Sequence, residues 1–347
     1  MFVLSLQQII MAVIKGNKQK REKMKELIVT KNDSGTRLDK FITKNCPTLP
    51  TSLMFKYIRT KKIKVNGKRG EINTRLNEGD VICAYINDEF FAKKAPAYDF
   101  LSAPATLDIV YEDENIILVD KKQGLLVHPD KSEYTNTLIA RIQHYLYKKG
   151  EYDPEKENSF RPALANRIDR NTGGIVIAAK NAEALRILCD KIKYREIDKR
   201  YIAVVHGVPK KKTDLLEGFL EKDESQNRVF MSKNKNDINK SVKTKYTVLQ
   251  SKNGLSLLEI ELLTGRTHQI RAHMAAIGHP LLGEGKYSKS NDKKLGFDKQ
   301  ALYSYSLKFD FKTDAGILEY LNGKRFTVKS VWFADQLFGE QYKSLLE

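Results

Sequence analysis

From residue 107 onward the chain alternates between short apolar runs and stretches that have a single apolar face. Apolar runs bounded by turn residues are typical of strands, and they occur at Ile175–Ala179, Tyr201–Gly207 and Leu255–Leu263. Stretches with one apolar face are typical of helices, and they occur at Thr137–Tyr147, Ala182–Lys193 and Gln269–Ile277. The segment Ile109–Pro129 predicts a hairpin, because two β segments flank an acidic turn and a glycine turn follows.

A smaller module precedes this part, at residues 26–90. Its pattern predicts one helix that begins near Arg37, a second helix at Ser52–Arg59, and then a hairpin whose turn is Asn66-Gly67. Residues 91–106 contain two prolines, several alanines and a Lys-Lys pair, which is typical of a linker. The sequence therefore predicts two domains joined by this linker, the second of them covering residues 107–340.

The formal net charge of the 347-residue chain is +18, and its excess is largest near the N-terminus. Residues 1–95 hold 20 Lys and Arg against 9 Asp and Glu. Such an excess indicates an acidic polymer or an anionic surface as the partner. The basic residues around the end of the second helix and the start of the hairpin are candidate phosphate contacts. They are Lys56, Arg59, Lys61, Lys62 and Lys64. The alternative for these residues is a solvated charged face.

Cysteine usage and hydropathy narrow the setting further. Cys46, Cys83 and Cys189 are far apart and form no CxxC pair, which fits a reducing cytoplasm. No apolar run approaches the roughly 18 to 20 residues that a membrane span needs. Met1–Ile14 is apolar and precedes a basic stretch, the reverse of the order in a secretory signal. We expect residues 1–25 to be a disordered extension, with Met24 as a sensible true start, and a short membrane-touching helix as the alternative.

The segment Pro162–Lys180 carries the most distinctive polar pattern. Arg167, Asp169 and Arg170 come directly before a Thr-Gly-Gly turn and an apolar run. Gly173 and Gly174 predict a tight backbone turn ahead of the strand. Asp169 is then expected on a loop at the mouth of a sheet, where a carboxylate between cations is a candidate for catalysis. A charge-paired surface loop is the alternative.

A second polar cluster lies at the start of the helix predicted at Gln269–Ile277. It packs four basic side chains into eight positions: Arg266, His268, Arg271 and His273. These cations need an anion nearby, either phosphate or a carboxylate such as Asp169. The separations of five and six among His268, His273 and His279 do not place two ligands on one helix face, so no metal site is predicted. His268 is expected to act through hydrogen bonds.

Several motifs of other enzymes are absent from the sequence. It contains no GxGxxG, no GxxxxGK[ST], no GxSxG and no HxE…PCxxC pattern. Together with the strong positive charge, these absences leave a cofactor-free enzyme that acts on RNA as the remaining hypothesis.

The order of features in the first module resembles the small RNA-binding module named after a small-subunit ribosomal protein, the S-four domain. The segments that carry the resemblance are Arg37-Leu-Asp-Lys-Phe, Ile63-Lys-Val-Asn-Gly and Leu76-Asn-Glu-Gly-Asp-Val-Ile. The resemblance implies that Arg37 belongs to an RNA-binding surface. The Arg37-Leu-Asp39 triplet is therefore assigned no catalytic chemistry, although it looks like a second Arg-x-Asp motif.

The second domain resembles the RluA-type family of RNA pseudouridine synthases over about residues 107–335. The family's motifs are matched, in order, by Asn166-Arg-Ile-Asp-Arg-Asn-Thr-Gly-Gly-Ile, Lys199-Arg-Tyr-Ile-Ala-Val-Val-His-Gly and Gly265-Arg-Thr-His-Gln-Ile-Arg-Ala-His-Met. The opening Ile109–Pro129 and the Gly278-His-Pro-Leu-Leu-Gly-Glu stretch also match. This sequence departs from the family pattern at Asn166, where His is usual, and at Gly173, where Ser is usual.

The resemblance implies a role for each matched residue. Asp169 is the essential carboxylate, which attacks the sugar or the ring or deprotonates the sugar. Arg271 pairs with Asp169, and Tyr201 stacks on the target base and takes or gives a proton in the last step. Among the substrate-binding residues, Arg167 enters the space left by the flipped base and Ile270 packs against the uracil ring. Arg266 and His268 complete that set.

We therefore expect an α+β catalytic domain, with a mixed, mainly antiparallel sheet and flanking helices, plus the small N-terminal domain. The expected substrate is large-subunit ribosomal RNA, because an attached S-four module accompanies the ribosomal members of the family. Transfer RNA is the alternative substrate, and a non-catalytic RNA-binding or ribosome-assembly protein is the alternative function. No metal or cofactor is expected, and the default is a cytoplasmic monomer.

Overall fold

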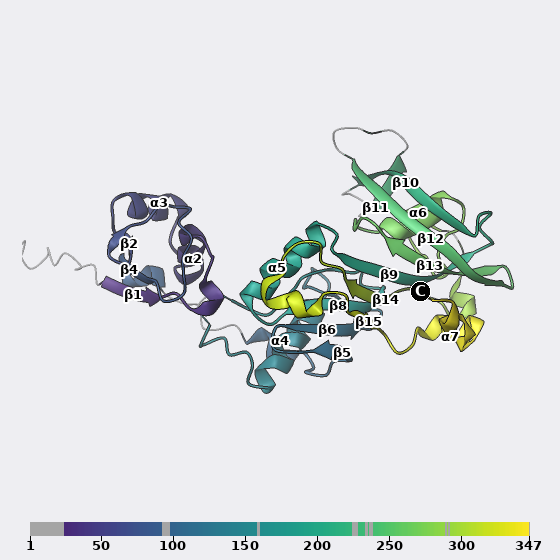
Figure 1. Ribbon diagram of the computed structural model, residues 1–347, viewed down its shortest axis with the longest axis horizontal. Coiled ribbons are helices and arrows are strands. Elements are labelled where there is room, and N and C mark those ends of the chain that lie inside the picture. The colour runs from purple at the N-terminus through teal and green to yellow at the C-terminus, as the bar shows by residue number, and fades with distance from the viewer. Residues whose placement is uncertain are drawn as a thin grey trace, which may run out of the picture. The chain divides into compact units, whose positions relative to one another are not determined.

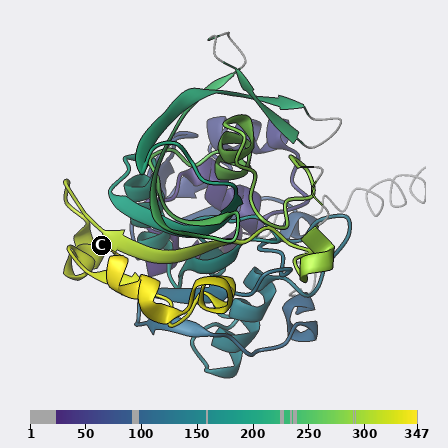
Figure 2. The same ribbon diagram turned by 90° about the vertical axis from the view of Figure 1, so that its right-hand side faces the viewer.

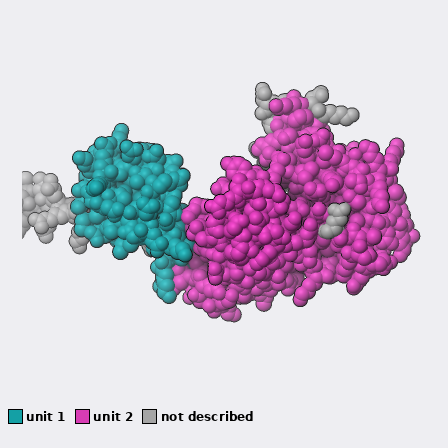
Figure 3. All heavy atoms as spheres, viewed as in Figure 1, with its two compact units in different colours: residues 1–97, 154–160 teal, residues 98–153, 161–347 magenta. Residues whose placement is uncertain are grey.

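The computed structural model describes residues 24–91, 98–157, 160–223, 228–232, 235, 239–288, 290 and 292–346. The chain divides into two compact units, residues 1–97 with 154–160 and residues 98–153 with 161–347 (Figure 3). The extension expected at residues 1–25 falls outside the described residues except for its last two, which begin the first strand. The domain boundaries expected from sequence stay a prediction.

In the described residues, the small unit is a four-stranded antiparallel sheet with two helices (Figure 1). The strand order is β1-β4-β2-β3, with bounds β1 (Met24–Ile28), β4 (Val81–Tyr85), β2 (Ile63–Val65) and β3 (Lys68–Arg69). The helices are α2 (Leu38–Asn45) and α3 (Thr51–Arg59), and short 3-10 turns lie at η1 (Lys31–Asp33) and η2 (Asp88–Phe91). Asn66 and Gly67 both have positive φ, as a two-residue hairpin turn requires, so the predicted turn is confirmed.

The core of the small unit forms where the apolar faces of its helices meet the sheet. Phe41 and Ile42 of α2, Ile58 of α3, Ile63 of β2 and Ile82 of β4 are all almost fully buried in one cluster. Each is an apolar position at helical or strand spacing, so local pattern and packing agree. This unit has a core of its own.

The large unit is built on one sheet that has eleven strands in the described part of the chain. Its main order is β11-β10-β12-β13-β9-β14-β8-β6-β5, with β15 paired to β14 and β7 paired to β8. The bounds are β5 (Ile109–Glu112), β6 (Ile116–Lys121), β7 (Ala163–Leu164), β8 (Gly173–Ala179), β9 (Ile197–His206), β10 (Thr213–Asp223), β11 (Arg228–Ser232), β12 (Lys240–Lys252), β13 (Leu255–Leu262), β14 (Leu302–Phe309) and β15 (Arg325–Thr327). All pairs are antiparallel except β14 with β8, so the predicted mixed, mainly antiparallel α+β fold is confirmed.

Helices flank this sheet. They are α4 (Leu138–Lys148), α5 (Ala182–Lys193), α6 (Gln269–Ala276) and α7 (Trp332–Phe338), with 3-10 turns η3 (Asp99–Ser102), η4 (Asp292–Leu295), η5 (Gly316–Leu321) and η6 (Glu340–Leu345). The expected helices α4, α5 and α6 agree with these bounds to within a residue or two. Helix α5 packs against β8, and α6 packs against β11 and β12 (Figures 1 and 2). No helix of the described residues is long and apolar enough to cross a membrane.

The start of the large unit's packed chain lies ahead of Leu107. Phe100 and Ala103, which we expected in the linker, are buried in a cluster that includes Val127 and, from α4, Ile142. The His144 ring nitrogen also lies 2.6 Å from the Ala103 carbonyl. The composition of this segment suggested a linker. The large apolar side chain of Phe100 nevertheless packs into the core beside α4 and makes the segment part of the folded unit.

The glycine pair before Ile175 differs from the sequence prediction. Gly173 and Gly174 belong to β8 instead of a turn, and they pair with Tyr303 and Ser304 of β14 in the sheet's one parallel ladder. A Cβ at Gly173 would lie 2.3 Å from the Tyr303 ring, and one at Gly174, where φ is +110°, would lie 2.2 Å from the Ser304 carbonyl oxygen. Close approach of β14 is therefore what requires both glycines.

The close contact of Gly173 with Tyr303 explains why glycine stands where the family usually has serine. It also leads to a testable prediction. Gly173→Ser, which introduces the usual family residue, is expected to lower the free energy of unfolding by about 2 kcal/mol, because the Tyr303 ring must move. That ring is held by a 2.7 Å hydrogen bond from its hydroxyl to Asp120. Urea denaturation measures the effect. Gly265→Ser is the matched control, since a Cβ there meets nothing within 4 Å; equal stability of the two variants would contradict the explanation.

Candidate active site

Asp169 lies in a turn that leads into β8, and hydrogen bonds hold that turn. The Asp169 carbonyl accepts a hydrogen bond from the Thr172 amide at 3.1 Å. The Arg170 carbonyl accepts two, from the Gly124 amide and from the Lys121 ammonium, both at 2.9 Å. The backbone that carries Asp169 is thus tied to the loop after β6, which orients the carboxylate before any substrate arrives.

The Lys121 side chain connects this turn to the loop after β6 through its hydrogen bonds. Its side chain is almost fully buried, and its ammonium donates to the carbonyls of Lys122, Leu125 and Arg170 at 2.8 to 3.0 Å. Burial lowers the pKa of Lys121 to about 7, and the nearby charge of Asp169 opposes that effect. Three carbonyl acceptors match the three N–H groups of the protonated form.

The Asp169 carboxylate is paired with Arg271 on α6. Arg271 Nη1 lies 3.0 Å from Asp169 Oδ2, while Nε and Nη2 hold Glu284 bidentately at 2.7 and 2.8 Å. Burial works to lower the pKa of Arg271, but the bonds to Glu284 and the charges of Glu284 and Asp169 outweigh it and raise that pKa. The Arg271 side chain is 8% exposed and that of Asp169 is 25% exposed, so the cation is sheltered and the carboxylate is open to a ligand.

His268 also lies near the Asp169 carboxylate. It precedes α6 with a left-handed backbone (φ 53°), its Nδ1 lies 2.9 Å from the Tyr287 hydroxyl, and its Nε2 lies 3.8 Å from Asp169 Oδ2. Burial lowers the pKa of His268, with Asp169 opposing and Arg271 adding to the shift. At neutral pH the ring is therefore uncharged, and the hydrogen-bonding role that we expected of His268 stays a prediction.

Tyr201 and Ile270 lie together in the apolar cluster beneath the site. Tyr201 is on β9 opposite Ser304 of β14, and both Tyr201 and Ile270 are about 5% exposed. Burial raises the pKa of Tyr201 to about 12; Ser304 opposes the rise and the charge of Asp169 adds to it. The phenol is therefore protonated at neutral pH, and its expected role in proton transfer stays a prediction.

Comparison with known proteins identifies the family to which this site belongs. Residues 115–276 match the family model described as RNA pseudouridylate synthase. A protein of Mycoplasma capricolum named uncharacterized RNA pseudouridine synthase is 32% identical over 316 residues, which are 90% of this chain and 99% of that protein. The chain belongs to the RNA pseudouridine synthase family. The resemblance of the second domain to RNA pseudouridine synthases is thereby confirmed; the S-four resemblance of the first module stays a prediction.

Two further comparisons extend this result. The ribosomal large subunit pseudouridine synthase D of Blochmanniella floridana is 31% identical over 300 residues, or 82% of this chain and 90% of that protein. The solved structure of human RNA pseudouridylate synthase domain containing 4 matches with a TM-score of 0.53 at 20% identity, and covers 67% of this chain and 92% of that chain. The second is a likeness of fold alone.

In this family member the remaining expected site residues lie at the surface. Arg167 is exposed and its charge acts on His128, whose pKa is lowered by burial and then by Arg167. Arg266 is exposed, and its backbone amide donates to Gln269 Oε1 at 3.1 Å. The second departure from the family pattern, Asn166, is buried and accepts a 2.8 Å bond from the amide of Ile177 on β8.

The sequence analysis missed Glu284, Tyr287 and Lys121. Glu284 neutralises Arg271, and the guanidinium lies 5.5 Å from the centroid of the Tyr287 ring. Glu284 ends the Gly278-His-Pro-Leu-Leu-Gly-Glu stretch that matched the family pattern, but nothing in that stretch marked it as the partner of Arg271. A buried carboxylate that pairs with a distant arginine leaves no local sequence pattern, because the two residues meet only in the folded chain.

Of the predicted RNA-binding residues of the small unit, Lys56 and Arg59 lie on α3, Lys61 and Lys62 in the turn after it, Lys64 on β2, and Arg37 directly before α2. Lys56, Arg59 and Lys61 are exposed, and the Lys62 and Lys64 ammonium groups lie 5.2 and 5.3 Å from the ring centroids of Tyr57 and Tyr85. Arg37 donates two hydrogen bonds to Asp39, at 3.1 and 2.8 Å. Their contact with RNA stays a prediction.

The three histidines set aside as metal ligands each have a hydrogen-bond partner. The Nδ1 atoms of His268, His273 and His279 lie 2.9, 2.8 and 2.9 Å from the Tyr287 hydroxyl, the Thr244 hydroxyl and the His206 carbonyl. In the described ranges no three His, Cys, Asp or Glu side chains are placed to hold a metal ion.

Buried His273 predicts a pH-dependent stability. Burial lowers its pKa to about 4, against about 6.5 in an unfolded chain. Between these values the unfolded chain binds more protons, so stability rises with pH, and acidification through the window costs about 3 kcal/mol. Denaturation of wild type and His273→Gln from pH 7 to 4 tests this, because other groups titrate in both. Parallel pH profiles would rule the assignment out.

Proposed function

We propose that this protein is an RNA pseudouridine synthase that isomerises uridines of large-subunit ribosomal RNA, with Asp169 as its essential carboxylate. The observation that carries the proposal is the Asp169 carboxylate, partly open to solvent and paired at 3.0 Å with a buried arginine. The name of the Blochmanniella relative supports the ribosomal substrate.

The reaction breaks the bond between the ribose and the ring nitrogen of uracil and rejoins the ring through carbon. Atoms balance within the substrate, because the proton that leaves the carbon is replaced by one on the freed nitrogen. Arg271 keeps Asp169 ionised even where the substrate excludes water. Asp169 then attacks the sugar or the ring, or removes a proton from the sugar; each role needs the ionised form.

The target uridine must leave its stack for Asp169 to reach it, at a cost of a few kcal/mol. We propose that exposed Arg167 fills the space that the base vacates. Tyr201 and Ile270 then form the apolar wall behind the uracil, and the protonated Tyr201 phenol acts as a donor. Burial raises the pKa of this phenol, so it is protonated at the pH of the reaction.

The positive small unit completes the proposal. Exposed Lys56, Arg59 and Lys61 suit phosphate contacts, which supply affinity with little sequence information. We propose that this unit is the S-four-type module and that it holds ribosomal RNA while the large unit acts on a uridine. A cytoplasmic monomer is part of the same proposal.

The experiment is tritium release from RNA labelled at position 5 of uracil, with transcripts of large-subunit ribosomal RNA and of transfer RNA as separate substrates. Release from the ribosomal transcript alone is the expected result. Release from transfer RNA alone would overturn the substrate and keep the reaction. No release from either RNA, with binding intact, would favour the RNA-binding or assembly protein.

A further inference from the structure

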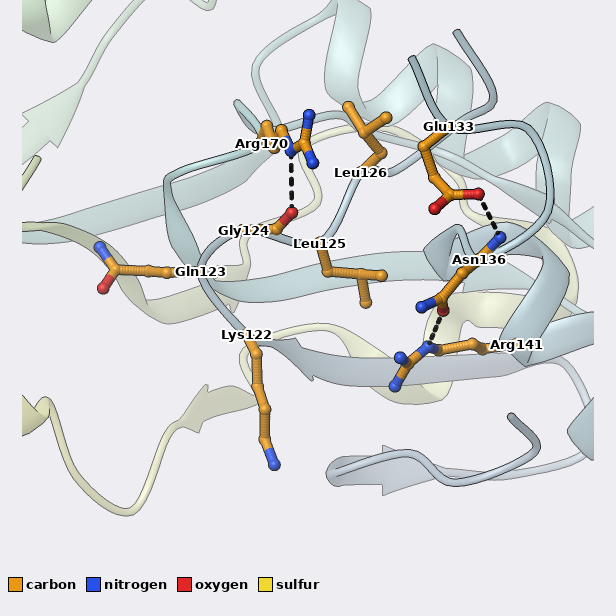
Figure 4. Close-up of a pocket in the computed structure, with 9 residues that line it drawn as sticks. All are labelled: Lys122, Gln123, Gly124, Leu125, Leu126, Glu133, Asn136, Arg141 and Arg170. Carbon is orange, nitrogen blue, oxygen red and sulfur yellow. Dashed lines mark hydrogen bonds between the residues drawn. The ribbon is translucent and has the colours of Figure 1, made fainter. Parts of the chain in front are cut away.

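A polar hollow of about 280 Å³ opens beside the Asp169 turn (Figure 4). One wall is Arg170, the residue that follows Asp169, and the opposite wall includes Asn136 and Arg141. The Arg170 guanidinium donates through Nε to the Gly124 carbonyl at 3.0 Å, as Figure 4 shows. The hollow and the candidate catalytic turn are therefore parts of one hydrogen-bonded unit.

The hollow is cationic. Lys122, Arg141 and Arg170 line it, against the single carboxylate of Glu133. Lys122 pairs with Asp108 at 3.2 Å, which leaves the two arginines as the main positive charges. In the part of the chain that the structure describes, neither guanidinium forms an ion pair with a carboxylate.

Among the described residues, the Glu133 carboxylate forms no ion pair with either arginine, although the charge of Arg170 acts on it. Its Oε1 accepts hydrogen bonds from the amides of Thr135 and Asn136, both at 2.9 Å, and from the Thr135 hydroxyl at 3.1 Å. These bonds, with a smaller contribution from the charge of Arg170, lower the pKa of Glu133. The carboxylate oxygen is therefore held mainly by the loop that leads into α4.

Among the described residues, one nitrogen of Arg141 has a hydrogen-bond partner. Its Nε donates to Asn136 Oδ1 at 2.9 Å, and its two terminal nitrogens remain for a ligand. Arg141 is in the first turn of α4, where the positive end of the helix dipole adds to its charge. A fixed guanidinium of this kind suits the bidentate binding of a phosphate.

The small size and polar lining of the hollow indicate what kind of anionic ligand it could bind. Pockets for drug-sized ligands measure about 300–1,000 Å³ and are mostly apolar. This hollow lies below that range, and its only large apolar side chains are Leu125 and Leu126. It has room for one phosphate-bearing unit, whose remaining binding energy must come from outside the hollow, as it does when that unit belongs to a polymer.

We propose that this hollow binds a phosphate-bearing nucleotide of the substrate RNA next to the target uridine, with Arg141 and Arg170 on its phosphate and Leu125 and Leu126 against its sugar. The inference rests on the proposed function, because it assigns a subsite of that reaction. Arg170 connects the two sites: the residue that contacts the neighbouring phosphate directly follows the carboxylate that acts on the uridine. The subsite would set the register of the strand relative to Asp169.

The test uses the full-length chain with Arg141→Gln, and Arg141→Met as a second variant that keeps the aliphatic stem. Both lose the charge, while the catalytic turn keeps all its hydrogen bonds. We expect kcat/KM for tritium release from the ribosomal transcript to fall about tenfold with kcat within about twofold. The slope of log affinity against log salt is expected to fall by about 0.7, the value for one single-strand phosphate contact.

Two matched variants give the inference its specificity. Arg141→Lys keeps the charge and is expected to restore the salt slope. Lys148→Gln makes the same charge change at the exposed far end of α4 and is expected to leave both quantities at the wild-type value. Equal losses in Lys148→Gln and Arg141→Gln would overturn the subsite, because the effect would then be general electrostatics.

The outcomes also separate this inference from the proposed function. An active wild type with an equally active Arg141→Gln, and an unchanged salt slope, overturns the inference alone. A wild type that releases no tritium overturns the proposed function before any variant is compared, and the subsite of that reaction is overturned with it. A loss of kcat without a change in KM would likewise overturn the subsite, because a phosphate contact remote from the reacting atoms is made in ground and transition state alike.

Discussion

Asp169→Asn is expected to abolish tritium release from uracil-labelled RNA, with a loss of at least about a thousandfold in kcat and no loss of RNA binding. The amide has the shape of the carboxylate but can neither attack nor accept a proton at neutral pH. Arg271 keeps its bidentate bonds to Glu284, so its charge is still compensated after the substitution. The fold should therefore be retained, and the loss should lie in the chemical step.

The measurement compares tritium release and gel-shift affinity for wild type and Asp169→Asn on the same ribosomal transcript. Asp190→Asn is the matched control, because Asp190 is an exposed carboxylate on α5 and takes no part in the proposed site. Full activity of Asp169→Asn would refute the assignment of the essential carboxylate. Loss of binding together with activity would point instead to a structural role for Asp169.

Arg271→Met is expected to have the largest effect on stability, a loss of about 3–5 kcal/mol in the free energy of unfolding, and to abolish activity as well. Glu284 has a fully buried side chain, and Arg271 is the cation that compensates it. Removal of Arg271 leaves that carboxylate buried without the cation that compensates it, where its charged form is costly. Asp169 loses its cation at the same time.

A double variant separates these two effects. Glu284→Gln removes the buried charge and keeps an oxygen to accept the Lys286 amide, which Glu284 Oε1 holds at 2.8 Å. Arg271→Met combined with Glu284→Gln should therefore be more stable than Arg271→Met alone, yet equally inactive. Urea denaturation and tritium release measure the two properties. A double variant no more stable than the single one would contradict the ion-pair explanation.

The local part of the fold was predictable because its signals are local. The apolar stripe of α4 and the Asn66-Gly67 turn depend on residues a few positions apart, and both agree with the structure. The order of the three motifs that contain Asp169, Tyr201 and Arg271 predicted the family by resemblance. The functions of these residues stay predictions, because geometry places them near one another without showing a reaction.

Other features required the tertiary structure. The glycines at 173 and 174 looked like a turn, and only the approach of β14 shows that a strand needs them there. Phe100 looked like part of a linker until its ring was found buried beside α4. In both cases the residue's role is set by a partner that is distant in sequence.

The sequence by itself predicted several of the strands and helices, among them α4, α5 and α6, together with the cationic character and the family; the two-module organisation expected from it stays a prediction. Each of these follows from periodicity, composition or motif order, which are properties of neighbouring residues. Only the tertiary structure decided that Glu284 compensates Arg271, that Lys121 ties the Asp169 turn to the loop after β6, and that Arg141 and Arg170 face one hollow. These contacts join segments far apart in the chain, and the burial that gives them their strength exists only once the sheet has brought those segments together.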